Sequence, residues 1–190
     1  MKYNQLFTCC ALLISSYVLQ AQPAAVVYGG IAKLTNQAKL ITPEGTAHPG
    51  FVIGADAMLS STGLNLMGGL QYHQFHFIAT ENSSFFGMDD HISYVKLRFG
   101  MNAGFKVGSN SLLRFYGLAA APLLTNLPTS ERDVPQQSLR DTYFSAVGGA
   151  AFSLGPGVIF IEYQKGLSDV ATTLAETRNT SFVLSLGLMF

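Results

Sequence analysis

The sequence is poor in charged residues. They make up 12% of the 190-residue chain, about half of what is usual in a soluble globular protein, whereas hydrophobic residues make up 48%. Lys and Arg balance Asp and Glu at eleven each, and no basic cluster is visible along the chain. This balance gives no indication of a nucleic-acid-binding surface. The low total charge also argues against a water-soluble protein, whose outer surface would need more charged residues.

Cysteine is nearly absent as well. Cys9 and Cys10 both lie close to the N-terminus, and none follows them in the sequence. Neither a disulfide nor a cysteine metal site is therefore expected beyond this first segment, even in an oxidising compartment.

The first 22 residues have the pattern of a secretory signal peptide. One positive charge, Lys2, precedes an apolar run over residues 6–19 that is shorter than the roughly 20 residues a spanning helix needs. A lipoprotein is disfavoured because both cysteines lie inside this run and not after it. We expect cleavage near Ala21 or Gln22, which leaves residues 23–190 as one mature domain.

Long hydrophobic runs are missing from the mature chain. No stretch after residue 22 approaches 18 uninterrupted apolar residues, so helices cannot cross a membrane here. Because every backbone N–H and C=O must be paired internally in lipid, a closed β-barrel is the spanning structure that remains.

The mature sequence divides into eight apolar or alternating segments. They predict antiparallel strands near residues 25–34, 50–59, 64–78, 91–107, 111–125, 141–153, 157–167 and 179–190.

The connections between these segments alternate between long and short. The short ones are rich in Gly, Ser and Asn at residues 60–63, 108–110 and 154–157. The long ones, at residues 35–49, 79–90, 126–140 and 168–178, hold eight of the eleven acidic residues, and Asp141 lies at the edge of one. Outer-membrane barrels have short periplasmic turns and longer extracellular loops, so an eight-stranded up-and-down transmembrane barrel with both termini periplasmic is predicted.

Strict alternation supports the barrel. In the last segment Phe182, Leu184, Leu186, Leu188 and Phe190 share one face, and small residues occupy most of the other. A water-soluble β-sandwich or lipocalin-like barrel would also alternate, but its outward faces would need more charge than this chain has. The faces of the first, fifth and sixth segments, rich in Gly and Ala, stay unassigned.

Four charged residues fall within predicted strands on the face opposite the lipid. These are Asp56, Lys96, Arg98 and Glu162. A cation facing lipid near the midplane costs roughly 2–4 kcal/mol, so we expect all four in the lumen, paired as an ionic cluster that plugs the barrel. Gln71, Tyr94 and Gln164 are its expected hydrogen-bonding neighbours. The same groups could instead bind a small anion or relay protons. Lys165 interrupts the lipid face near the outer end of its strand, where it could snorkel to the interface.

Several segments resemble one family. The first strand with Tyr28-Gly29-Gly30-Ile31, the runs 92–99, 115–119 and 162–167, and the final strand 181–190 resemble PorT-like bacterial outer-membrane β-barrel proteins across the mature chain. The resemblance implies the same fold and location, with a possible role in a protein-secretion assembly. The closing aromatic, Phe190, resembles the terminal signal read by the barrel-assembly machinery.

Candidate catalytic and metal-binding residues are weak. His91 and Ser93 share a face at a strand end, as in some lipid-deacylating barrel enzymes, but no nearby acid follows to orient the imidazole. His73 and His76 are three residues apart and point to opposite faces of a regular strand, so neither metal ligation nor a cofactor is predicted, and both are expected at the membrane interface.

The sequence therefore favours a noncatalytic, monomeric outer-membrane barrel with a structural or interaction role in the cell envelope. Its expected partners are outer-membrane lipid and lipopolysaccharide, the barrel-assembly machinery and a possible envelope protein. A small pore or ligand-binding channel is the alternative, disfavoured because eight strands leave room only for side chains. A lipid-acting hydrolase is the weakest hypothesis.

Overall fold

The protein is a closed barrel of eight antiparallel strands. The computed structural model describes residues 23–36, 48–76, 91–126, 144–168 and 178–190. No helix in these ranges is long and apolar enough to cross a membrane. The strands are β1 (Ala24–Asn36), β2 (His48–Met58), β3 (Gly63–His76), β4 (His91–Lys106), β5 (Ser111–Asn126), β6 (Ser145–Leu154), β7 (Gly157–Gly166) and β8 (Asn179–Met189).

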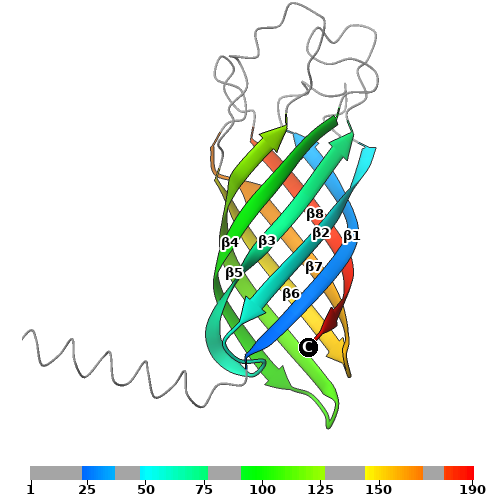
Figure 1. Ribbon diagram of the computed structural model, residues 1–190, viewed down its shortest axis with the longest axis vertical. Helices are drawn as coiled ribbons and strands as arrows, with labels where there is room; N and C mark the ends of the chain where they lie inside the picture. The colour runs from blue at the N-terminus through cyan, green and yellow to red at the C-terminus, as the bar shows by residue number, and fades with distance from the viewer. Residues whose placement is uncertain (1–22, 37–47, 77–90, 127–143, 169–177) are drawn as a thin grey trace, which may run out of the picture.

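Each strand pairs with its sequence neighbours, and β8 pairs with β1 to close the sheet. Figure 1 shows the strands tilted around a single cylinder, as barrel closure requires. The beginning of β1 and the C-terminus lie at the same end as the short turns (Figure 1). The predicted eight-stranded up-and-down barrel is confirmed.

The predicted strand boundaries agree with the structure to within two residues, with one exception. The sixth strand was expected from residue 141, but β6 begins at Ser145 and Phe144 lies outside it. Residues 141–143 lie outside the described ranges. The expected start was therefore four residues too early.

The short connections are tight turns. Residues 155 and 156 alone join β6 to β7, and Gly155 has a φ of 57°. A two-residue hairpin of this kind places its first central residue in the left-handed region, which glycine occupies without strain. Gly63, with a φ of 72°, plays a similar part after the β2–β3 turn.

The two faces of the sheet differ sharply. Outward side chains are large and apolar, and examples are Phe99, Ile161 and Leu186 at 60%, 48% and 65% exposure. A water-soluble β-protein would expose polar side chains on this outward face, whereas the lumen here holds both polar residues and an apolar cluster that includes Val26, Leu118 and Phe160. The inward side chains of β1, β5 and β6, which sequence patterning left unassigned, are mostly buried: Val26, Tyr28, Ala32, Leu34, Leu112, Arg114, Tyr116, Leu118, Ala120, Ser145, Val147, Ala151 and Ser153.

The closing seam leads to a prediction for Phe190. Its backbone N–H donates to the carbonyl of Ala25 at 2.8 Å, and the Ala25 N–H donates to the Phe190 carbonyl at 3.1 Å. Deleting Phe190 removes this pair and the terminal aromatic, so we expect much less folded protein in the outer membrane. Immunoblotting of membrane fractions measures the loss, with Phe190→Tyr as the control that keeps both features. Normal abundance of the deletion would contradict a role of Phe190 in assembly.

Candidate functional site

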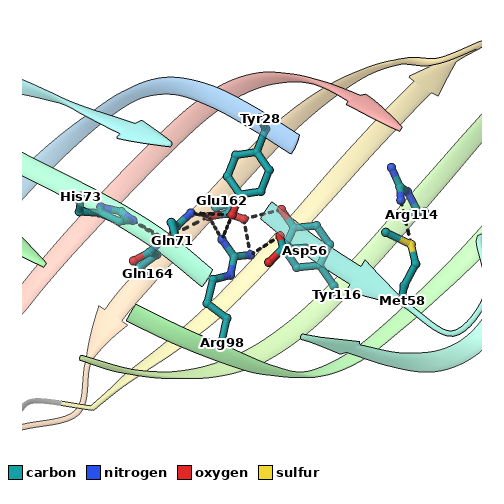
Figure 2. A network of polar contacts seen from close by, with 10 residues as sticks. All are labelled: Tyr28, Asp56, Met58, Gln71, His73, Arg98, Arg114, Tyr116, Glu162 and Gln164. Atoms are coloured by element: carbon teal, nitrogen blue, oxygen red, sulfur yellow. Dashed lines mark hydrogen bonds and ion pairs between the residues drawn. The ribbon is translucent and has the colours of Figure 1, made fainter. Parts of the chain in front are cut away.

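A charged network fills the middle of the lumen, and Arg98 of β4 is its centre (Figure 2). Its side chain is fully buried. The guanidinium binds Glu162 of β7 with both terminal nitrogens, Nη2 to Oε1 at 2.7 Å and Nη1 to Oε2 at 3.2 Å. Nη2 also lies 3.6 Å from Oδ2 of Asp56 on β2. Two carboxylates from different strands thus meet one arginine, and the pair with Glu162 has the bidentate geometry that makes such contacts strong.

Two tyrosines, Tyr28 and Tyr116, extend this network (Figure 2). The Oη of Tyr28 on β1 accepts a hydrogen bond from Arg98 Nη1 at 2.7 Å, and the Oη of Tyr116 on β5 donates to Glu162 Oε1 at 2.9 Å. Their rings flank Phe160, with centroids 5.0 Å and 6.5 Å away. The aromatic groups thereby enclose the ion pair and limit its access to water.

Glycines on neighbouring strands allow the tyrosine rings to lie flat against the wall. Tyr28 is paired with Gly54, and Tyr116 with Gly149. A Cβ at either glycine would lie 2.4 Å from the tyrosine ring, far inside van der Waals contact. The absent side chains therefore set the positions of both hydroxyl groups.

A second group of polar side chains continues the network toward the end of the barrel with the long connections. Gln71 donates to Glu162 Oε2 at 3.2 Å, and Gln164 donates to Gln71 Oε1 at 2.9 Å. His73 contacts both glutamine side chains. The ring of His73, expected at the level of the membrane interface, is fully buried in the lumen.

Lys96 occupies the same region. Its Nζ donates to Gln164 Oε1 at 3.2 Å and lies 5.7 Å from the ring centroid of Tyr94. The four sequence-predicted residues are all buried on the lumen side, and three of them, Asp56, Arg98 and Glu162, lie in one ion-pair group. Lys96 joins this group through Gln164.

Arg114 of β5 is a lumen cation that the sequence analysis missed. Nη1 contacts the sulfur of Met58 at 3.1 Å, and Nη2 donates to Ser153 Oγ at 3.0 Å. Figure 2 shows it set apart from the Arg98 group. Because an arginine that faces lipid is costly, the sequence could have assigned Arg114 to the lumen face of β5. Tyr116, two residues away, shares this face.

One small cavity lies in the described part of the lumen. This cavity has a volume of about 10 Å³ and is lined by Lys96, Gln164, Phe75 and Ser181, among others. This volume holds about one water molecule. It could not accommodate an organic ligand or cofactor.

The other candidate sites gain no support. Ser93 is buried in β4, and the side chain of His91 lies outside the described part of the structure, so the hydrolase hypothesis is untested. The side chain of His76 lies outside it as well. In the described ranges, no three His, Cys, Asp or Glu side chains are placed to share a metal ion.

Comparisons with known proteins identify the fold only. No protein-family model matches the chain, and no curated protein is similar in sequence. Neisserial surface protein A has a similar structure, with a TM-score of 0.53 and 10% identity over 88% of this chain and 97% of that one. Ail, the attachment invasion locus protein of Yersinia pestis, solved with the heparin analogue sucrose octasulfate, gives a TM-score of 0.48 and 13% identity over 89% and 99%.

Proposed function

We propose that this protein is a noncatalytic outer-membrane barrel that acts through its surface. The filled lumen carries the proposal. A network of side chains spans the middle of the barrel, where a conducting path would have to pass. It consists of Arg98, Glu162, Asp56, Gln71, Tyr28 and Tyr116. What the protein does must then take place on its lipid-facing wall or at its ends.

The outward wall supports a membrane location. Large apolar residues cover it on every strand, and the described carboxylates, Asp56 and Glu162, are in the lumen. The topology follows that of outer-membrane barrels, with the termini and short turns periplasmic and the long loops extracellular. Residues 1–22 would direct export and be removed.

The role that fits best is structural or adhesive: the barrel holds its loops at the cell surface and contacts lipopolysaccharide and an envelope protein. Its assembly would require the barrel-assembly machinery. The closed sheet leaves no free strand edge through which copies could pair, and this supports a monomer. The PorT-like resemblance extends this proposal to a place in a protein-secretion assembly.

Reconstitution in planar bilayers tests the proposal. The folded protein, identified by faster gel migration before boiling than after it, should give no steady single-channel conductance. The matched variant removes the plug: Arg98→Ala with Glu162→Ala should raise conductance if the network seals the lumen. Steady conductance of the unchanged protein would establish the pore alternative, and recovery of the protein as a soluble periplasmic species would overturn the membrane location.

A further inference from the structure

The lipid-facing wall carries three charged residues in the described ranges, and all three are positive. They are Lys33 near the end of β1, Lys165 near the end of β7 and Arg178 directly before β8. All three are exposed. The alternation of each strand places them in phase with outward apolar residues, namely Ile31, Tyr163 and Phe182.

The three cations come together because β7, β8 and β1 are consecutive around the barrel. Lys165 is opposite Thr180, two residues from Arg178, and Lys33 is opposite Phe182. With strands about 4.8 Å apart and a rise of about 3.4 Å per residue, the Cα atom of Lys165 lies roughly 8 Å from that of Arg178 and roughly 12 Å from that of Lys33. Side chains of this length can converge on one group.

Their position along the barrel is also shared. They lie near the ends of β1 and β7 and directly before β8, on the side of the connections of residues 37–47 and 169–177. The outward apolar residues Ile31, Tyr163 and Phe182 follow them toward the other end of the barrel. The outward faces of β2 to β6 carry no charge in the described ranges. The grouping of these three cations on consecutive strands at one end of the barrel favours a shared anionic partner over independent snorkelling of each side chain.

We propose that Lys33, Lys165 and Arg178 bind the phosphate groups of a phosphorylated glycolipid, lipopolysaccharide, in the outer leaflet. This inference rests on the proposed outer-membrane location. Two lysines and an arginine supply charge-assisted hydrogen bonds to phosphate oxygens, while Tyr163, Phe182 and Ile31 offer an apolar surface for an acyl chain. An ordinary phospholipid with a single phosphate would engage fewer of the cations at once.

Binding of lipopolysaccharide to the folded, detergent-solubilised full chain tests the site. The triple variant Lys33→Gln, Lys165→Gln, Arg178→Gln should bind about 100-fold more weakly, on the basis of the attraction that one basic residue near a membrane surface contributes. The matched control is Lys106→Gln, because Lys106 is an exposed lysine at the opposite end of the barrel. This variant should bind lipopolysaccharide with the affinity of the unchanged protein. A heat-dependent gel shift verifies that every variant is folded.

Dephosphorylated lipopolysaccharide and phosphatidylglycerol complete the design. The unchanged protein should bind dephosphorylated lipopolysaccharide about as weakly as the triple variant binds intact lipopolysaccharide. Equal affinity of triple variant and unchanged protein, or an equal loss in Lys106→Gln, would overturn the site. Phosphatidylglycerol binding of equal strength and equal dependence on the three cations would overturn the glycolipid as its ligand. Because these measurements use purified protein, they give a result even if cell fractionation contradicts the outer-membrane location.

Discussion

Replacing Arg98 with methionine should lower the free energy of unfolding by about 3–5 kcal/mol, because removal of one partner leaves buried charge without compensation. Asp56 and Glu162 are 2% and 1% exposed, and Arg98 makes the ion pairs to both. Urea unfolding of the barrel in phospholipid vesicles, followed by the gel shift, measures the change. The variant should neither create nor abolish transport.

Arg114→Met is the matched control for this loss. Arg114 is equally buried, but its side-chain hydrogen bonds go to the neutral Met58 and Ser153, so its removal should cost only about 1 kcal/mol. Adding Asp56→Asn and Glu162→Gln to Arg98→Met should restore much of the lost stability, since the uncompensated charges are then gone. If Arg98→Met costs no more than Arg114→Met, the ion-pair group does not hold the lumen together.

Valine substitutions at two adjacent glycines of β6 should differ in their effect on the stability of the barrel. A Cβ at Gly149 would lie 2.4 Å from the ring of Tyr116, whereas a Cβ at Gly148 would meet nothing within 4 Å. Gly149→Val should therefore destabilise the barrel by about 1–3 kcal/mol through overpacking and displace the Tyr116 hydroxyl from Glu162. Gly148→Val, which faces outward, should leave stability unchanged or raise it, because valine favours strands.

The same unfolding assay compares the two valine variants. Tyr116→Phe provides the control that separates packing from hydrogen bonding, since it keeps the ring over Gly149 and removes only the hydroxyl. Equal effects of valine at positions 148 and 149 would show that Tyr116 does not pack against this wall as the structure has it.

The strand order and the inward placement of four charged residues were determined by the sequence. Alternation with a period of two assigns each side chain of β2, β4 and β7 to lipid or lumen, and the cost of charge in lipid leaves one choice for Asp56, Arg98 and Glu162. The alternation is weak where both faces are small. That is why Tyr28, Arg114 and Tyr116, on the Gly- and Ala-rich β1 and β5, were absent from the predicted cluster.

Which inward residues meet was decided only by the tertiary structure. Alternation gives the face of a residue but not its height in the barrel, and that height depends on the register of all eight pairings and on the stagger at closure. The register brings Arg98 to Glu162 and leaves Lys96 with Gln164, although both cations lie on the same strand two residues apart. Closure of β8 against β1 likewise brings Lys33 near Lys165 and Arg178, which are more than a hundred residues away in a sequence that shows no basic cluster.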